Sequence, residues 1–287
     1  AIKGLISKYS IEFEGKDLQV AINIIPKILE MALENDKEVD FDDMIWIPLM
    51  KGFKMPVYDS LFVDEAQDFD EMQRQLILRC LNGGRCIVVG DPQQAIYGFR
   101  GADSDSMELF LSKLEGREIS RFPLTTTWRC PVSVVREANR YVNNYRAKDD
   151  APMGSVVVNA SFNPQGKDMV LCRYNAPLIS AFYDLIIEGK KAKILGREME
   201  KGLINLVRQA NGLEDKVECL KIFISKASNV GGIVEEIKRV FANQRDGIIL
   251  STVHKAKGLE AKNVWILATE RMPHPRTKNL QEERNIC

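Results

Sequence analysis

Carboxylate and amide side chains follow a short apolar run in the first half of this chain. Asp64 and Glu65 come directly after Leu61–Val63, within the string LFVDEAQDFD. A carboxylate at the end of a buried strand can hold Mg²⁺ through water, and a second one beside it can orient or deprotonate an attacking water. The same residues also suit the first turn of a helix, where carboxylates offset free backbone amides. The string by itself leaves both interpretations open.

A second polar cluster lies in VVGDPQQAIYGFRGAD, residues Val88–Asp103. Gln94 can sense a phosphate or a positioned water, and Tyr97, Phe99 and Arg100 follow in close order. An aromatic ring beside an arginine suits stacking on a base together with contact to a phosphate. An Asp-Pro turn with a core aromatic is the alternative interpretation.

Two more clusters lie in the second half of the chain. Trp128 and Arg129, in LTTTWRCP, offer an aromatic face for a nucleobase and a charge that does not titrate. A Trp-Arg pair is also common in surface packing. Thr252, His254 and Lys257, in STVHKAKGLE, bring hydroxyl, imidazole and ammonium donors that suit a phosphodiester backbone. Taken alone, His254 fits a structural role equally well.

Short β-branched runs precede these clusters, and segments of helical periodicity separate them. Apolar runs without polar alternation predict strands buried on both faces of a parallel sheet that helices flank, so the fold class is α/β. The expected strands lie in SLFVDE, RCIVVGDPQQ, ISRFPLTTTWR, MVLCRY and KAKIL, with two more in DGIILSTVHKAKGLEAKNVWILA. The expected helices are residues 17–34, which Pro26 should kink or split, an acidic start at DFDDMIWIPLM, and EMQRQLILRCLNGG, PVSVVREANRYVNNY, APLISAFYDLIIEGK, EKGLINLVRQANG and GGIVEEIKRVFANQ.

Length and composition bound the class of protein. A chain of 287 residues suits two domains, and 45% hydrophobic with 28% charged residues is typical of a soluble globular protein. Lys plus Arg equal Asp plus Glu at 40 each, so nucleic-acid binding would need a local patch. The six cysteines are scattered and form no CxxC pair, which favours reduced thiols over a zinc site. With no membrane-length apolar run and no signal segment, we expect an intracellular, cytoplasmic protein.

The wording and order of the four clusters resemble motifs II, III, IV and V of the UvrD/PcrA/Rep-like helicases of superfamily 1. The strings VDEAQD, VVGDPQQAIYGFRGAD, LTTTWRCP and STVHKAKGLE carry the resemblance, which runs from about Val39 to the C-terminus. It implies two RecA-like domains of the P-loop NTPase type, ATP and Mg²⁺ as cofactors, and 3′ to 5′ movement on single-stranded DNA or on DNA with a single-stranded tail. We expect residues 1–123 to hold the later part of the first domain, including a helical N-terminal segment. Residues 124–287 would hold the second domain, with a short helical insertion around 196–246.

The resemblance also implies roles for individual residues at the matching positions. At the nucleotide these are Asp64 for Mg²⁺, Glu65 for the hydrolytic water, Gln94 and Arg129 for the γ-phosphate, Trp128 for adenine and Glu260 for the ribose. At DNA they are Tyr97, Phe99, Thr252, His254 and Lys257, and for coupling between sites they are Gln67, Asp68 and Arg100.

The chain departs from the family pattern in the phosphate-binding loop. No GxxxxGK[ST] string occurs, because the Gly-Lys pairs at 15–16, 166–167 and 189–190 are followed by Asp, Asp and Lys. The family's last motif, an arginine-bearing helix, would begin just past Cys287. We therefore expect a fragment that lacks the N-terminal Walker A segment of the same protein and does not hydrolyse ATP alone. A helicase-derived scaffold that only binds DNA or a protein is the alternative, although the residues for hydrolysis are intact.

Overall fold

The structure is a computed structural model. It describes residues 17–35, 37–81, 83–97, 103, 105–114, 116–196, 200, 204, 214–227, 229–242 and 247–272. The contacts divide the chain into two compact units, one ending at Pro123 and the other beginning at Leu124, and each is described by itself. Among the described residues, no helix has the length and apolar character needed to cross a membrane.

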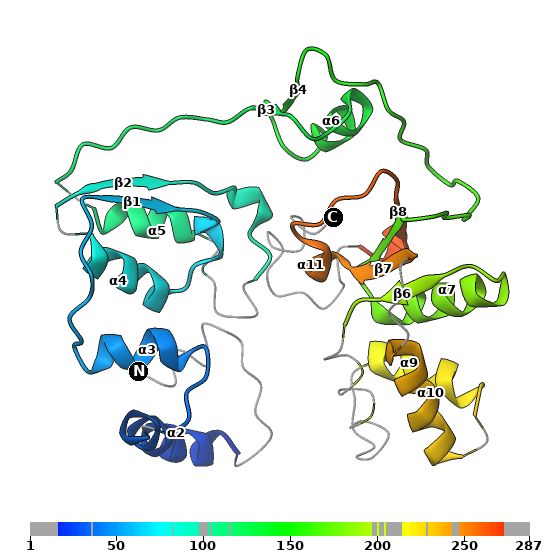
Figure 1. The fold of residues 1–287 in the computed structure, drawn as a ribbon, viewed down its shortest axis with the longest axis horizontal. Helices are drawn as coiled ribbons and strands as arrows, with labels where there is room; N and C mark the ends of the chain where they lie inside the picture. Colours follow the sequence, from blue (N-terminus) through cyan, green and yellow to red (C-terminus); the bar gives the residue numbers. More distant parts are fainter. Residues whose placement is uncertain are drawn as a thin grey trace. The chain divides into compact units, whose positions relative to one another are not determined.

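Unit 1 is built around two parallel strands joined by a helix (Figure 1). Its elements are α2 (Asp17–Glu34), α3 (Asp43–Met50), β1 (Ser60–Val63), the 3-10 helix η1 (Ala66–Asp68), α4 (Glu71–Cys80), β2 (Arg85–Val88), the 3-10 helix η2 (Pro92–Gln94) and α5 (Ser106–Ser112). The strand register runs from Ser60 opposite Arg85 to Val63 opposite Val88. This confirms the predicted β-α-β unit.

One face of the β1–β2 sheet carries the core of unit 1. Leu61, Cys86 and Val88 pack against a buried cluster that includes Phe110 of α5. Figure 1 shows α4 and α5 on the same side of the two strands. Phe62, on the opposite face, is 76% exposed. The expectation that these strands are buried on both faces is therefore wrong for the described residues, because both helices cover the same face.

The two helices before β1 test the predicted helix boundaries. α2 spans the predicted residues Asp17–Glu34, and of the two effects expected of Pro26, a kink or a split, the split does not occur. At the start of α3, the Asp40 carboxylate accepts the backbone N–H groups of Asp42 and Asp43 at 2.9 and 2.8 Å. The acidic residues at this position therefore serve a helix start, as predicted.

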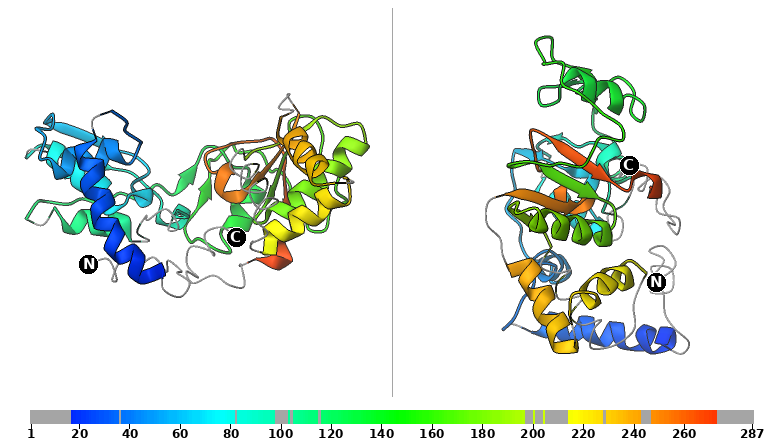
Figure 2. Two further views of the ribbon diagram at one scale, coloured as in Figure 1. Left: turned by 90° about the horizontal axis from the view of Figure 1, so that it is seen from below. Right: turned by 90° about the vertical axis from the view of Figure 1, so that its right-hand side faces the viewer.

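Unit 2 holds a four-stranded parallel sheet with the order β6-β7-β5-β8. Its elements are β3 (Thr126–Thr127), α6 (Val132–Ala138), β4 (Arg146–Ala147), β5 (Met169–Cys172), α7 (Asn175–Ile187), β6 (Ala192–Ile194), α9 (Glu214–Ile224), α10 (Val230–Ala242), β7 (Ile248–Thr252), α11 (Val253–Ala256), β8 (Val264–Leu267) and the 3-10 helix η4 (Thr269–Arg271). Figures 1 and 2 show α7 along one face of this sheet, with α9 and α10 beyond it. Buried apolar residues of β5, β6, β7 and these three helices form one continuous core.

One predicted strand and one predicted helix are shorter in the structure than expected, and a second predicted helix lies mostly outside the described residues. The strand expected in residues 119–129 is limited to β3, because Pro123 lacks the N–H that a strand ladder needs and Phe122 and Leu124 stay exposed. The helix expected to reach Tyr145 ends at Ala138. There the Asn139 side chain donates to the Tyr145 carbonyl (2.8 Å) and accepts its N–H (3.1 Å), which closes a loop. The helix expected in residues 200–212 lies mostly outside the described residues.

Asp168 ties the start of β5 to the start of β8. Its carboxylate accepts the Gln165 backbone N–H (2.9 Å), Trp265 Nε1 (3.2 Å) and Asn263 Nδ2 (2.9 Å). Burial would raise the pKa of Asp168, but these three hydrogen bonds lower it below its ordinary value.

The lowered pKa of Asp168 predicts a pH-dependent stability. The Asp168 carboxylate takes up a proton more readily in the unfolded chain than in the folded one. Its contribution to the free energy of unfolding is therefore complete above the unfolded pKa and is lost as pH falls through the folded pKa. We expect Asp168→Asn to reduce the free energy of unfolding at pH 7 by about 1–3 kcal/mol and to flatten its acid dependence. Urea titrations at pH 7 and at acid pH measure both effects. Asp184→Asn, at an exposed position of α7, is the control. An unchanged acid dependence in Asp168→Asn would contradict the prediction.

Candidate nucleotide site and its hydrogen-bond relay

The turn after β1 carries the first of the predicted site residues. Asp64 and Glu65 are both exposed, and the Asp64 carboxylate accepts the Glu65 backbone N–H at 2.9 Å. Glu65 has a φ of 52°, in the left-handed region that residues other than glycine rarely adopt. Strained backbone of this kind clusters at functional sites, where the surrounding structure holds it in place.

Gln67 lies at the centre of this turn and is buried, with 1% of its surface exposed. Its side-chain Nε2 donates to Glu65 Oε2 at 2.5 Å. Its Oε1 accepts the backbone N–H of Asp91 at 3.0 Å. Because Asp91 lies beyond the end of β2, one buried amide side chain joins the ends of the two neighbouring strands.

Asp91 carries the connection on to Gln94. Asp91 precedes η2, and its carboxylate accepts the Gln93 backbone N–H (2.9 Å) and the Gln94 side-chain Nε2 (2.8 Å). Hydrogen bonds therefore run without a break from Glu65 through Gln67 and Asp91 to Gln94. We call these four residues the relay. Asp91 was not among the predicted site residues. The Asp-Pro pair was a signal for it, since Asp is a common N-cap and Pro a common first helical residue.

Gly90 fits tightly against the relay. A Cβ at this position would lie 2.5 Å from Gln67 Oε1 and 3.1 Å from the Ala66 backbone nitrogen. Any larger residue must therefore displace the buried amide or the turn that carries it.

This close approach predicts the effect of Gly90→Ala. We expect the variant to lose roughly 1–3 kcal/mol in free energy of unfolding, since overpacking forces side chains and backbone to shift. We also expect faster hydrogen exchange at the Asp91 amide. Gly232→Ala in α10 is the control, because its Cβ meets Ala227 at an ordinary 3.4 Å. If Gly90→Ala is as stable as the wild type and the Asp91 amide exchanges at the wild-type rate, the prediction that a Cβ at residue 90 displaces Gln67 or the turn is wrong.

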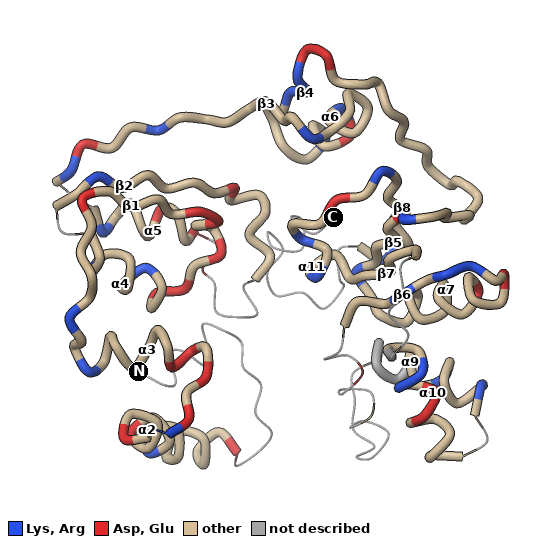
Figure 3. Tube along the Cα trace, viewed as in Figure 1, with Lys and Arg blue, Asp and Glu red and all other residues tan. Residues whose placement is uncertain are grey.

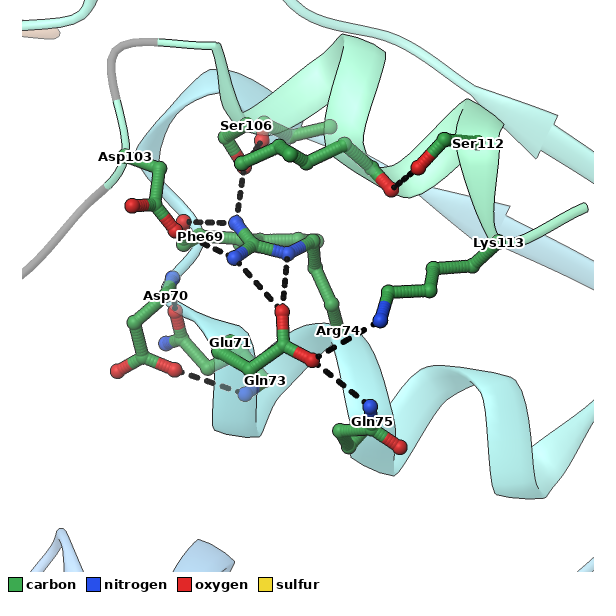
Figure 4. Close-up of polar contacts among 12 residues, drawn as sticks. Phe69, Asp70, Glu71, Gln73, Arg74, Gln75, Asp103, Ser106, Ser112 and Lys113 are labelled. Atoms are coloured by element: carbon green, nitrogen blue, oxygen red, sulfur yellow. Dashed lines mark hydrogen bonds and ion pairs between the residues drawn. The ribbon is translucent and has the colours of Figure 1, made fainter. Parts of the chain in front are cut away.

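Arg74 is at the centre of a second polar network, which includes Glu71, Asp103 and Ser106 (Figure 4). Its side chain is 1% exposed and pairs with the carboxylates of Asp103 and, at 3.0 Å, Glu71. Arg74 Nη1 also donates to the Phe69 carbonyl (2.9 Å) and to Ser106 Oγ (3.1 Å). The guanidinium thereby joins α4, the turn before it and the start of α5.

The charges of this network stabilise one another. Burial would lower the pKa of Arg74, but its hydrogen bonds to Asp103 and Glu71 outweigh burial and raise it. The pKa of Glu71 is lowered, first by the hydrogen bond from Gln75 and then, against the effect of burial, by Arg74 and Lys113. Arg74 therefore stays charged across the accessible pH range. Sequence reasoning missed both Arg74 and Asp103, because they are 29 residues apart and no local pattern pairs them.

The three predicted nucleotide residues of unit 2 lie on exposed segments. Arg129 Nε lies 2.5 Å from Glu260 Oε1, and the two side chains are 65% and 58% exposed. The Trp128 side chain is 80% exposed, with Lys148 Nζ 5.8 Å from its ring centroid. The structure thus brings Arg129 and Glu260 together, although they are far apart in sequence.

The predicted DNA residues are described only in part. Thr252 ends β7 and precedes α11. His254 lies in α11 and Lys257 directly follows it, and both are half-buried. Figure 3 shows basic residues on α11, in contrast to the acidic turn after β1. Tyr97 is half-buried, whereas Phe99 and Arg100 lie outside the described residues.

The carboxylate of Asp64, directly after β1, is the predicted ligand of Mg²⁺. In the part of the chain that the structure describes, no three His, Cys, Asp or Glu side chains are placed to hold a metal ion. Mg²⁺ does not need such a cage, since it keeps several waters and takes one or two carboxylates together with substrate phosphates. The exposed carboxylate of Asp64 fits that requirement.

Comparison with known proteins places these residues in a family. The chain matches the UvrD/REP helicase N-terminal domain over residues 5–115 and the UvrD-like helicase C-terminal domain over residues 124–287. A probable DNA helicase II homolog from Mycoplasma capricolum is 26% identical over 302 residues, covering 90% of this chain and 40% of that protein. DNA helicase II of Escherichia coli strain K12 is 35% identical over 89 residues, which is 30% of this chain and 12% of that one. RecBCD enzyme subunit RecB of Mycobacterium tuberculosis is 40% identical over 76 residues, 26% of this chain and 7% of that one.

The chain therefore spans less than half the length of these relatives. The two domain matches cover nearly all of the chain, and the second alone covers more than half of it. This chain belongs to the UvrD/Rep-like family of DNA helicases.

Proposed function

We propose that this chain is part of an ATP-dependent motor that moves 3′ to 5′ along single-stranded DNA. Residues 1–123 would serve as the later part of the first motor domain, and residues 124–287 as the second. The observation that carries the proposal is the relay, because it joins a carboxylate suited to water activation with an amide suited to phosphate sensing.

The residues of the relay divide the work of hydrolysis. Bound ATP with Mg²⁺ supplies the phosphoryl group, and Asp64 would hold the metal. Glu65 would orient the attacking water and accept its proton. Gln67 holds the Glu65 carboxylate through Nε2, which fixes its orientation without neutralising it. Gln94 would contact the γ-phosphate, so a change there would reach Glu65 through the Asp91 carboxylate and backbone N–H and the Gln67 side chain.

In unit 2, the proposal assigns the nucleotide contacts to exposed side chains. Trp128 would stack on adenine, and Arg129 would exchange its Glu260 partner for the γ-phosphate. Glu260 would then contact the ribose. An exposed ion pair costs little to open, which suits residues that change partners during a cycle.

DNA would be contacted by donors and aromatic rings from both units. Thr252, His254 and Lys257 suit backbone phosphates. Phe99 and Tyr97 would stack on bases, and Arg100 with Asp68 would couple DNA contact to the nucleotide site.

A binding scaffold derived from a helicase is the second candidate, because this chain has no GxxxxGK[ST] string. The first test is to read the coding sequence upstream of Ala1 for that string. The second compares this chain with an extended protein, meaning this chain joined to a segment that carries the loop. We expect DNA-stimulated ATP hydrolysis in the extended protein and none in this chain. Absence of hydrolysis in both would favour the scaffold, and DNA-stimulated hydrolysis by this chain alone would overturn our account of the missing loop.

A further inference from the structure

Asp91 and Asp103 are each attached to the Glu65–Phe69 turn. The first attachment is the hydrogen bond between Gln67 Oε1 and the Asp91 N–H, at 3.0 Å. The second is the buried ion pair between Arg74 and Asp103, whose guanidinium also donates to the Phe69 carbonyl. The backbone N–H of Asp103 points to that same carbonyl, at 3.5 Å.

Ser106 extends the second attachment to the other end of the turn. Its hydroxyl accepts from Arg74 Nη1 and donates to the Ala66 carbonyl at 2.8 Å. The carbonyls of Ala66 and Phe69, which enclose Gln67 in the sequence, are therefore both held by one network. Arg74 therefore holds the Phe69 carbonyl directly and the Ala66 carbonyl through Ser106.

Arg74 and Asp103 are both buried, which strengthens their ion pair. The side chains of Arg74 and Asp103 are 1% and 8% exposed, so water does not replace a lost partner. Losing one carboxylate from a buried guanidinium is unfavourable even though Arg74 keeps its ion pair with Glu71, and the guanidinium fork fixes the direction of its bonds. A shift of Asp103 should therefore shift Arg74 with it.

We propose that Arg74 is a positioning residue: its buried ion pair with Asp103 transmits the position of Asp103 to the Glu65–Phe69 turn, and so to Gln67 and Glu65. The inference rests on the proposed function, in which Phe99 and Arg100, just before Asp103 in the sequence, respond to DNA and Glu65 serves hydrolysis. These contacts reach the turn through its backbone carbonyls, whereas the relay reaches it through the Gln67 side chain.

The test separates positioning from stability with a paired substitution. Arg74→Met/Asp103→Leu replaces both buried charges with apolar side chains of similar size, which often keeps or improves stability. Arg74→Lys keeps the charge but loses the fork. The control is Arg121→Met/Glu108→Leu, which removes an exposed ion pair of α5 with contacts of 2.7 and 2.9 Å.

The first readout is hydrogen exchange at the Asp91 amide of this chain, with global unfolding measured alongside. We expect exchange at least about fivefold faster in the double variant, although it is folded, and no change in the control. An unchanged hydrogen-exchange rate at the Asp91 amide in a folded double variant overturns the proposal. If the double variant does not fold, Arg74→Lys decides the same question.

The second readout is ATP hydrolysis by the extended protein. We expect the stimulation by single-stranded DNA to fall at least about fivefold in the double variant. The KM for ATP should stay within about twofold, because the Arg74 side chain is buried and pairs with carboxylates of the protein. Full DNA stimulation in the double variant overturns the inference. If the wild type shows no DNA-stimulated hydrolysis, the proposed function fails and the exchange result still decides whether Arg74 positions the relay.

Discussion

Replacing Glu65 with glutamine is expected to lower kcat for ATP hydrolysis by the extended protein about 10²–10⁴-fold. The amide has the size of the carboxylate but cannot accept a proton from water. It can still accept the bond from Gln67 Nε2, so the turn and the KM for ATP should change little. Steady-state kinetics with saturating single-stranded DNA measure the effect.

Glu118→Gln is the matched control for this substitution, because Glu118 is an exposed carboxylate outside the relay. The control should hydrolyse ATP as the wild type does. Hydrolysis at the wild-type rate in Glu65→Gln would remove Glu65 from the mechanism, while leaving the hydrogen bonds of the relay as a structural feature.

Replacing Arg129 is expected to have the second large effect. Arg129→Ala should lower kcat by about 10³-fold, the scale of an arginine that stabilises charge on a transferring phosphoryl group. Arg129→Lys should restore little, because a single ammonium cannot reproduce the planar fork. Since Arg129 and Glu260 are mostly exposed, the free energy of unfolding should change by only about 0–1 kcal/mol.

The control for Arg129 is Arg140→Ala. Arg140 is similarly exposed and pairs with Glu137 at 2.8 Å within unit 2. Kinetics and thermal unfolding of the three variants separate a lost phosphate contact from a lost surface ion pair. Recovery of the wild-type kcat by lysine would contradict a role that needs the guanidinium, and a normal kcat in Arg129→Ala would remove the residue from hydrolysis.

Much of the fold was predictable because the signals are local. The apolar run before Asp64 and the periodicity of α4 are contained in single segments, so the β1–α4–β2 unit follows from them. Residues 119–125 misled the prediction, because an apolar run with Pro123 lacks the ladder donor that pairing requires. The end of α6 was not predictable from periodicity, since the Asn139 side chain replaces the next helical turn.

The site was predictable to the extent that its residues share a motif. Glu65 and Gln67 lie in one string, and in the structure hydrogen bonds link them to Gln94 through Asp91. Arg74 and Asp103 could not be found in this way, because their contact joins residues on different elements. The chemical roles of all these residues remain predictions of the proposed function.

The central claim is that Glu65 and Gln94 act as one unit through Gln67 and Asp91. The most direct measurement is a double-mutant cycle in the extended protein, with Gln67→Met, Gln94→Met and both together, read as DNA-stimulated ATP hydrolysis. Members of one connected unit are non-additive, so we predict that the double variant is no slower than the slower single variant. Losses in kcat that simply multiply would contradict the account, because they would mean that Gln67 and Gln94 act independently.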